Sequence, residues 1–419
     1  MTFLLFGSFV VLLTIVAATT LTWTLFAWRT PEQLDGTRFP RLRPARHSFS
    51  LIVPARHEEV VLLRTLGRMA DADHPDVEVL VVVGHDDDRT ARIAHEAAAR
   101  SPRVRVVVDE GWPKSKPKAL NTALPYCQGD VVGVFDAEDD VHPELLAHVD
   151  SLFQSSGADV VQSGVQLMNY WSNWYSVHNV LEYYFWFRSR LHFHAAARFI
   201  PLGGNTVFVR TDVLRAEGGW DDACLAEDCD VGVRLSSGGH RVAVAYDPRL
   251  VTREETPPSV GALLKQRTRW NQGFLQVLRK GDWRRLPTFR QRALALYTLA
   301  MPFLQAFAGA LVPASVATAL LLTVPLPLAL LSFLPLVPTA VILAVQLVGL
   351  SEFCRTYGRP ARVRDYARLL LGAGPYQVLL AGAALRAVWR ELRGQRGWEK
   401  TQHLGAHLQP STEHLRSAA

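Results

Sequence analysis

The sequence predicts an α/β domain with a largely parallel sheet, placed between membrane-spanning segments. Hydrophobic residues make up 49% of the 419 residues and charged residues 20%, but the two classes are segregated along the chain. Residues 1–28 and 291–350 are almost free of charge, whereas residues 29–290 have the composition of a water-facing enzyme. In that middle part, continuous apolar runs alternate with helical patterns, which is typical of parallel sheets covered on both faces.

The net charge and the number of cysteines indicate which partners the protein binds and which redox compartment it faces. The net charge of +6 is modest, and the arginines adjoin apolar runs, which favours an anionic membrane surface over nucleic acid as a partner. The four cysteines have no paired metal-ligand spacing and are too few for a disulfide framework, which indicates a reduced, cytoplasm-facing domain.

The apolar stretch from Thr2 to Trp28 has about the length of a bilayer-spanning helix. It lacks a clear charged start and a small-residue cleavage site, so we expect an uncleaved anchor rather than a signal peptide. Five arginines follow at once, and the positive-inside rule therefore places that side in the cytoplasm and the amino terminus outside. They are Arg29, Arg38, Arg41, Arg43 and Arg46.

Four buried-type strands are expected next, at residues 49–53, 77–83, 104–108 and 131–135, with helices over 58–69 and 90–99. Ligands of such sheets bind beyond the carboxyl ends of the strands. The polar residues that follow the strands are therefore site candidates. They are Ala55-Arg56-His57-Glu58, Asp86-Asp87-Asp88 and Asp136-Ala137-Glu138-Asp139-Asp140.

The third of these segments is the sharpest candidate. Carboxylates at the end of a buried strand need a partner, and two of them two positions apart can share a divalent ion with the oxygens of a diphosphate. Asp136 and Glu138 have this spacing. The alternative is an acidic, turn-forming loop ahead of the helix expected at Pro143.

Two further stretches have both a structural and a functional interpretation. Glu227-Asp228 opens a helix, so its carboxylates are either an ordinary cap or a rigidly held general base. The aromatic-rich segment 170–193 is expected to pack in the core and at the membrane interface rather than to bind a ligand.

Residues 255–273 predict a helix that carries several ligand-binding side chains. Gln266 and Arg269 fall on adjoining turns, and Trp270 adds a broad flat ring beside them. An arginine fork suits a phosphate, and an indole face suits a sugar ring. The alternative is an exposed basic helix on a solvated face.

In combination these segments resemble the membrane-embedded family 2 glycosyltransferases, which include cellulose, chitin, hyaluronan and poly-N-acetylglucosamine synthases. The resemblance covers about residues 48–275 and the flanking membrane segments, and its most specific part is the Gln-x-x-Arg-Trp motif at 266–270. It implies a GT-A (Rossmann-like) catalytic domain with N-terminal and C-terminal transmembrane helices. It also implies a nucleotide-sugar donor, expected to be uridine-linked, and a Mg²⁺ or Mn²⁺ ion on the diphosphate.

The resemblance also assigns roles by position. Asp228 matches the expected general base, with Glu227 beside it in the catalytic pair, and the expected metal ligands are Asp136 and Glu138. The donor is expected to contact Ala55, Glu58, Asp86, Asp87, Lys116, Asp136, Gln266 and Arg269. The acceptor is expected to contact Trp270, Gly219 and Trp220.

The chain departs from the family pattern at several positions. Ala226 replaces the Thr of the Thr-Glu-Asp element, Glu138 replaces the usual second Asp, and His57 stands where Asn is common. The uridine-contacting Asp after the second strand is replaced around Val83-Gly84, which leaves Asp86 or Asp87 as candidates.

The expected organisation is an anchor (1–28), a basic juxtamembrane linker (29–47), the GT-A domain (48–275), an interfacial helix (276–292), a transmembrane region (293–390) and a cytoplasmic tail (391–419). Residues 293–350 can hold two or three spans, and 369–389 either cross or dip into the bilayer. Trp398-Glu399-Lys400-Thr401-Gln402-His403 resembles a tail element of bacterial members, expected near the active site.

The expected function is inverting transfer of a sugar onto a growing β-linked polysaccharide that leaves through the membrane segments. The alternatives are non-processive glycosylation of a lipid acceptor, or a non-catalytic membrane scaffold that binds a nucleotide. The expected location is a bacterial-type plasma membrane with the catalytic domain in the cytoplasm. Membrane lipids are expected partners and nucleic acid is not, while the sequence does not decide whether an accessory subunit is present.

Overall fold

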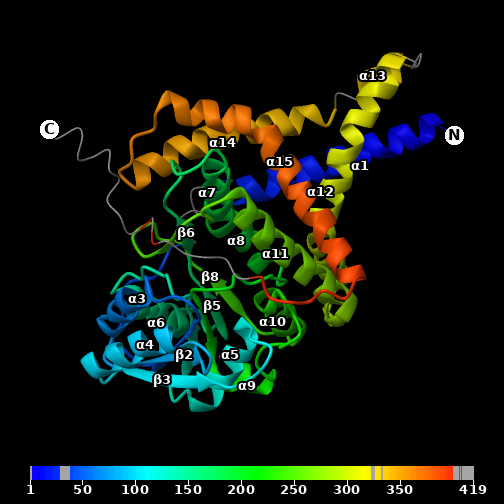
Figure 1. The fold of residues 1–419 in the computed structure, drawn as a ribbon. Helices are drawn as coiled ribbons and strands as arrows, with labels where there is room; N and C mark the ends of the chain where they lie inside the picture. The colour runs from blue at the N-terminus through cyan, green and yellow to red at the C-terminus, as the bar shows by residue number, and fades with distance from the viewer. Residues whose placement is uncertain are drawn as a thin grey trace.

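The computed structural model describes residues 2–28, 38–321, 326–331 and 334–399, together with Gly405 and His407. An α/β domain forms one end of the molecule and long helices form the other (Figure 1). Arg29 and residues 400–403, to which two of the sequence predictions refer, lie outside the described residues.

The α/β domain is built on a seven-stranded sheet, within the described residues, in the order β3-β2-β1-β4-β7-β5-β8. The first four strands along the chain are parallel, as predicted, whereas β7 runs antiparallel to its neighbours β4 and β5. A smaller sheet pairs β6 with β9. The strand bounds are β1 Phe49–Ala55, β2 Val77–Gly84, β3 Val104–Asp109, β4 Val131–Val134, β5 Val160–Gln162, β6 Val165–Leu167, β7 Val207–Arg210, β8 Val242–Val244 and β9 Thr252–Glu254.

Both faces of the sheet are buried, which explains the continuous apolar runs. Along β2, Val79 and Val81 belong to one core cluster and Leu80 to another, because successive side chains of a strand point to opposite faces. Helices α3 (Leu62–Ala70), α4 (Asp88–Arg100) and α6 (Leu145–Ser156) contribute to the first cluster. Helices α5 (Lys116–Ala123) and α7 (Ser176–Phe185) contribute to the second.

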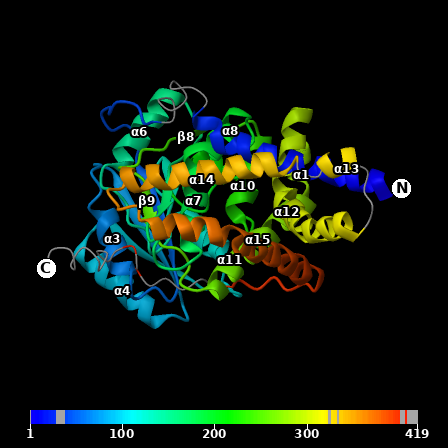
Figure 2. The same ribbon diagram turned by 90° about the horizontal axis from the view of Figure 1, so that it is seen from above.

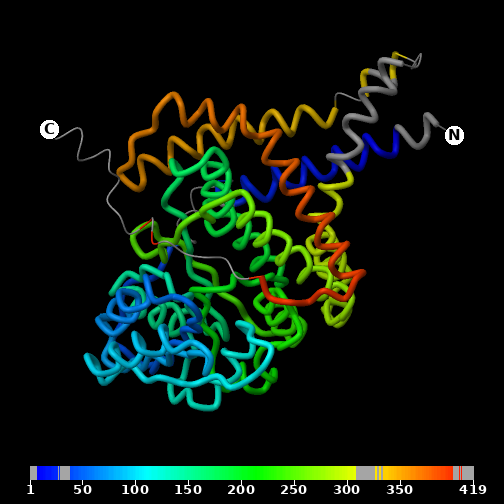
Figure 3. The backbone as a smooth tube through the Cα atoms, viewed as in Figure 1, coloured from blue at the N-terminus to red at the C-terminus, as the bar shows by residue number. Residues whose placement is uncertain are grey.

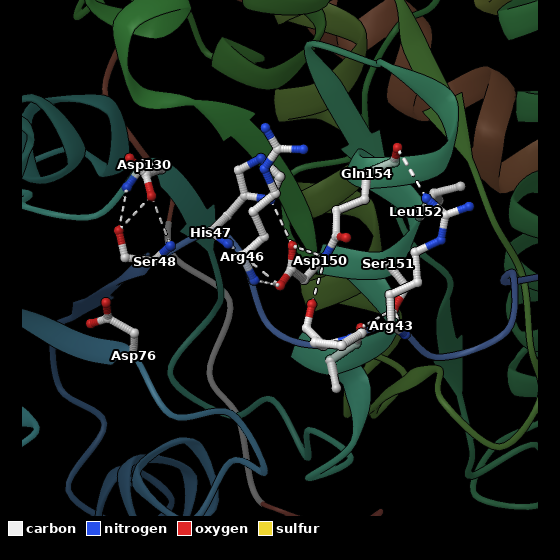
Figure 4. Close-up of polar contacts among 12 residues, drawn as sticks. Arg43, Arg46, His47, Ser48, Asp76, Asp130, Asp150, Ser151, Leu152 and Gln154 are labelled. Atoms are coloured by element: carbon white, nitrogen blue, oxygen red, sulfur yellow. Dashed lines mark hydrogen bonds and ion pairs between the residues drawn. The ribbon is translucent and has the colours of Figure 1, made fainter.

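The chain that leads into β1 is fixed on α6 by Asp150 (Figure 4). The Asp150 carboxylate contacts His47 Nδ1 at 2.6 Å and accepts the Arg46 backbone N–H at 2.7 Å. Burial alone would raise the pKa of Asp150, but these hydrogen bonds outweigh it and lower the pKa. The described part of the predicted linker is therefore docked on the α/β domain.

The site is positioned by the helices in the second half of the domain. They are the π-helical turn η3 (Trp186–Arg190), α8 (Leu191–Ala196), α9 (Thr211–Ala216), α10 (Glu227–Ser237) and α11 (Val260–Lys280). The predicted single interfacial helix over 276–292 is not formed. Gly281, with φ of +83°, ends α11, a short 3-10 turn η4 (Asp282–Arg285) follows, and α12 begins at Phe289.

The remaining elements form the helical layer. They are α1 (Thr2–Leu25), α12 (Phe289–Leu321), α13 (Leu326–Leu331), α14 (Leu336–Thr356) and α15 (Val363–Leu392). Among the described residues, three helices are long and apolar enough to cross a membrane: 7–25, 336–356 and 363–392. Helix α1 packs against α14 and α12, and Figure 2 shows α1 and α14 running alongside each other.

Helix α15 continues without a break through Pro375, where the sequence left a re-entrant turn open. It packs along α11 and α12, and the tube in Figure 3 follows it over the top of the molecule and then down along the right-hand side. Leu371, Val378 and Leu385, which are seven residues apart, are 63–79% exposed. An apolar stripe therefore runs along the face of α15 that points away from the protein.

Candidate active site

Three predicted site residues on different elements open onto one space. The Lys116 ammonium, at the start of α5, contacts the Asp136 carboxylate and donates to the Gly204 carbonyl at 2.8 Å. A Cβ atom placed on Gly204 would lie 3.2 Å from Asp228 Oδ2 and 3.7 Å from Lys116 Nζ. Gly204 therefore marks the point where the strand-end acid, the lysine and the α10 carboxylate meet.

The two carboxylates at the start of α10 are held in an environment that resists their ionisation. Burial and the charge of Asp228 raise the pKa of Glu227 to about 7, although Lys116 and Arg269 act in the opposite direction. Burial likewise raises the pKa of Asp228, against the effect of the Cys229 backbone N–H, Lys116 and Arg269. Glu227 is 3% exposed whereas Asp228 is half-buried, so Asp228 is the member of the pair that can reach a substrate.

Helix α11 approaches this pair closely because Gly273 has no side chain. A Cβ atom there would lie 2.3 Å from the Cβ of Ala226, the residue that caps α10. Arg269 lies one turn earlier on α11. Its positive charge partly counteracts the rise in the pKa of both Glu227 and Asp228. The small residues at 226 and 273 thus bring the Gln-x-x-Arg-Trp motif against the candidate base.

Trp270 joins the same site through Tyr183, a residue that the sequence reading assigned to packing. The two rings are 6.4 Å apart, and the Arg267 guanidinium lies 4.6 Å from the Trp270 ring centroid. Burial raises the pKa of Tyr183, and the charges of Glu254 and Asp136 raise it further. The Tyr-Tyr-Phe-Trp-Phe run gives no signal that singles out Tyr183.

The acidic loop after β4 brings several carboxylates close together. Asp139 accepts the Asp136 backbone N–H at 2.8 Å and an Asn205 amide N–H at 3.1 Å, and the same amide contacts Glu254. Burial raises the pKa of Asp139 well above its usual value, and the charges of Glu254, Asp136 and Glu138 add to that rise. Carboxylates gathered in this way are the oxygen ligands that a divalent cation prefers.

The described residues do not by themselves complete a metal site. No group of three or more His, Cys, Asp or Glu side chains among them is placed to hold a metal ion. Glu138 is 6% exposed, and Asp136 is the more accessible of the two predicted ligands, with a side chain 32% exposed. The assignment of both to a metal stays a prediction.

The described tail residues contact the surroundings of the site. The Arg269 guanidinium lies 4.3 Å from the centroid of the Trp398 ring. Farther along, Gly405 donates its backbone N–H to Glu255 at 3.1 Å, and His407 Nε2 lies 3.1 Å from the Glu138 carbonyl oxygen. Of the predicted tail element, Trp398 and Glu399 are among the described residues.

The structure separates the two candidate nucleotide carboxylates. Asp87 is 4% exposed, caps α4 through the Thr90 N–H at 3.2 Å and accepts the His57 N–H at 2.5 Å. Although burial would raise the pKa of Asp87, these hydrogen bonds lower it. Asp86 is more exposed and pairs with Arg56 at 2.7 Å. Asp86 is therefore the more accessible candidate, while Asp87 is engaged in holding the loop after β1.

A second group of side chains lies near Asp86. Arg56 stands 6.0 Å from the Trp112 ring centroid, and the Trp112 side chain is 69% exposed. The sequence placed Arg56 in a strand-end segment but assigned it no role, and Trp112 was not predicted as a site residue. Of the other predicted donor residues in this region, Ala55 and Glu58 are buried, and the Glu58 N–H donates to Thr90 Oγ1 at 3.2 Å.

The remaining predicted residues divide between scaffold and site. Trp220 is 6% exposed within the core, and Asn121 holds its backbone N–H at 3.0 Å and its carbonyl at 2.7 Å. Gly219, with φ of +70°, makes the turn before it. Their acceptor role stays a prediction. In contrast, Gln266 Oε1 is buried without a hydrogen-bond partner in the described structure, which suits a side chain awaiting a polar ligand.

Comparison with known proteins places these residues in a defined context. The family described as "Glycosyltransferase like family 2" matches residues 44–273. The chain is 32% identical over 233 residues, 54% of this chain and 47% of the relative, to beta-monoglucosyldiacylglycerol synthase of Synechocystis. It is 23% identical over 251 residues, 60% of this chain and 59% of the relative, to poly-beta-1,6-N-acetyl-D-glucosamine synthase of Staphylococcus epidermidis. The chain thus spans about half the length of the first curated relatives it matches.

A solved structure extends the likeness of the fold to the helical layer. The mannosyltransferase PcManGT from Pyrobaculum calidifontis, in complex with GDP-Man and Mn²⁺, has a TM-score of 0.60 at 19% identity. The likeness covers 92% of this chain and 99% of that one. The GT-A architecture predicted from the sequence is therefore confirmed.

Proposed function

The chain belongs to glycosyltransferase family 2, and on this premise we propose that it moves a sugar from a nucleotide diphosphate to a hydroxyl of a membrane lipid, with inversion. The observation that carries this proposal is the meeting of Lys116, Asp136 and Asp228 around Gly204. A cation for the leaving diphosphate and a carboxylate for the incoming hydroxyl are the two groups that a single displacement requires.

In this proposal Asp228 accepts the proton of the attacking hydroxyl. Its half-buried carboxylate at the first turn of α10 is fixed by the Cys229 N–H at 2.8 Å. Its raised pKa makes it a stronger base than an exposed Asp. Glu227 is buried beside Asp228, and the two carboxylates interact electrostatically.

The leaving diphosphate is proposed to lie against Lys116, Arg269 and Gln266. Lys116 and Arg269 carry the positive charge, and the unpartnered Gln266 oxygen faces a polar group of the donor or of its hydration. Tyr183 and Trp270 line the adjoining side, where a sugar ring can stack.

A divalent cation, Mg²⁺ or Mn²⁺, is proposed to be held by Asp136 and Glu138. The proposal is supported by the closeness of the carboxylates, because the charges of Glu254, Asp136 and Glu138 all act on Asp139. When bound, the cation would neutralise the diphosphate as it departs. The base of the nucleotide, predicted to be uridine, stays a prediction.

The lipid acceptor is favoured over a polymer by the surroundings of α11. Arg267, three residues before Trp270, contacts Glu182, which also accepts the Tyr376 hydroxyl of α15 at 2.7 Å. The opposite face of α15 is the exposed apolar stripe of Leu371, Val378 and Leu385. The acceptor side of the site therefore lies next to a helix suited to a bilayer surface, and the relative at 32% identity is named for a diacylglycerol acceptor. We propose that α1, α12 and α14 anchor the protein in the membrane, with the catalytic domain on the cytoplasmic side.

A growing β-linked polysaccharide is the second candidate acceptor. Trp270 and Tyr183 form an aromatic pair at the acceptor side, and such a pair suits a glycan end as well as a single sugar. The relative at 23% identity is named as a polymer synthase.

Product analysis with purified full-length protein tests the proposal and separates the two acceptors. UDP- and GDP-linked sugars would be supplied with Mg²⁺ or Mn²⁺ and with vesicles that contain diacylglycerol, and the products would be separated by mass. A single hexose on the lipid is the expected product. A ladder of oligosaccharides would establish the polymer instead, and no transfer from any donor would refute both.

A further inference from the structure

A cavity lies where Arg253 of β9 and neighbouring residues of the catalytic domain meet the connection between α14 and α15. Its volume is about 340 Å³. The side chains that decide its chemistry are Arg249 and Arg253 from the catalytic domain and Arg359 and Tyr357 from the connection. We propose that this cavity is a second ligand site, which binds a phosphate group.

The positive charge of the cavity is only partly offset. Arg249 pairs with Asp247 at 3.1 Å. Arg253 and Arg359 have no carboxylate within ion-pair distance among the described residues, and Arg359 instead stacks over Trp171 at 5.0 Å. Two guanidinium groups that have no ion-pair partner among the described residues thus line one cavity. A planar guanidinium can donate two parallel hydrogen bonds to two oxygens of a phosphate.

The positive-inside rule does not account for this arrangement. It explains arginines beside the ends of membrane helices, and Arg359 is such a residue. Arg253, however, is an exposed side chain in the middle of β9, a strand of the catalytic domain. The cluster therefore combines two separate parts of the chain.

The cavity is preformed, because hydrogen bonds of tyrosine hydroxyls hold the connection against the catalytic domain. Tyr246 and Tyr357 share a hydrogen bond of 2.8 Å, and the Tyr170 hydroxyl donates to the Pro360 carbonyl at 2.7 Å. Gly358, with φ of +62°, turns the chain so that the Arg359 N–H returns to the Cys354 carbonyl at 2.7 Å. A rigid wall lowers the entropy that a ligand must lose on binding.

The site is linked to the acidic loop through the backbone of β9. Arg253 and Asp140 exchange both backbone hydrogen bonds, each 3.1 Å long. The next residue, Glu254, points to the other side of the strand and contacts Asn205, which also holds Asp139. An anion on Arg253 therefore lies one residue away from the carboxylate network of the donor site, and we expect its binding to change the affinity for the donor.

Direct binding of inorganic phosphate to full-length protein tests the proposal without any transfer reaction, so its failure is distinct from failure of the proposed function. Arg269→Gln would serve as the background, because it weakens phosphate binding at the proposed donor site. In that background, Arg253→Gln and Arg359→Gln should each weaken phosphate binding about tenfold or more, since each removes a charged hydrogen-bond partner. Arg100→Gln is the matched control, because Arg100 is an exposed arginine on α4 that pairs with Glu96, and it should leave binding unchanged.

Two comparisons then identify the source of the phosphate and the reliability of the variants. If the natural ligand is an anionic lipid headgroup, nanodiscs that contain phosphatidylglycerol should displace inorganic phosphate. Nanodiscs made of phosphatidylcholine alone should not displace it. If neither nanodisc displaces it, the ligand is a soluble phosphate compound. Unaltered melting temperatures confirm that the variants are folded, and Arg253→Lys should restore binding only in part. Equal binding in Arg253→Gln and its parent, or equal loss in Arg100→Gln, would overturn the site.

Discussion

Replacing Gly273 by alanine tests whether the close contact of α10 and α11 is what assembles the site. In the interior of an ordinary helix this change stabilises by about 1 kcal/mol. Here the new methyl carbon would lie 2.3 Å from the Ala226 Cβ and 2.5 Å from the Ala226 backbone nitrogen. Carbon atoms in contact are about 3.5–4.0 Å apart, so α11 must move away from α10 by roughly 1 Å or more.

The consequence should be larger for catalysis than for folding. Overpacking of this kind costs about 1–3 kcal/mol of stability. The same displacement carries Arg269 away from Glu227 and Asp228, and a shift of about 1 Å in a positioned group can reduce turnover about 100-fold. We therefore expect Gly273→Ala to fold, to melt at a lower temperature and to lose turnover by about two orders of magnitude.

The control comes from the same helix. A Cβ atom on Gly261 would meet only Ser259 Oγ, at 3.9 Å, so Gly261→Ala should keep full turnover and should not lower the melting temperature. Turnover would be measured with labelled donor and lipid, and folding by thermal denaturation. Gly273→Ala turnover within about threefold of the parent, less than about 1 kcal/mol of barrier, would refute the reasoning.

Three other substitutions test the charges of the site and of the linker. Asp228→Asn should retain donor binding in a titration yet lose about 10²–10⁴-fold in turnover, and near-normal turnover would remove Asp228 as the base. The pKa of Glu227 is raised to about 7 in the folded protein, so Glu227 contributes stability at low pH that is lost as the pH rises through that value. Glu227→Gln should therefore flatten the decline of melting temperature between about pH 5 and 8. A decline as steep as in the parent would contradict this. Asp150 has a lowered pKa, so its contribution is present above the unfolded value and is lost on acidification. Asp150→Ala should cost about 3–5 kcal/mol and expose Arg43 and Arg46 to trypsin, whereas an unaltered cleavage pattern would show that the linker is held by other contacts.

The sequence predicted the parallel half of the sheet because parallel strands that are buried on both faces have continuous apolar sequences. It did not predict that β7 lies antiparallel between β4 and β5, because that placement depends on pairing between distant segments. It also placed one helix over 276–292, where Gly281 in a left-handed conformation ends α11. Local patterns report burial and periodicity, but not which distant strand provides the partner.

The candidate site shows the same division. Lys116, Asp136 and Asp228 could be named because each opens or follows a regular element and fits the order of a known motif. The separation of Asp86 from Asp87 could not, because both stand in one acidic triplet and only the fold assigns Asp87 to the Thr90 and His57 N–H groups. Tyr183 could not be singled out among the neighbouring aromatic residues either, since its interest depends on a ring contact with the distant Trp270.

Helix α11 links the membrane layer to the chemistry, and two of its arginines show how. Arg267 contacts Glu182, and Glu182 accepts the hydroxyl of Tyr376 on α15. Arg269, two positions later, acts on the α10 carboxylates and stacks on Trp398 of the tail. Because Arg267 and Arg269 are two residues apart on one helix, a shift of α15 that is transmitted through Glu182 to Arg267 would also move the charge of Arg269 near Asp228. The packing of α15 and the basicity of the candidate base are therefore linked through α11.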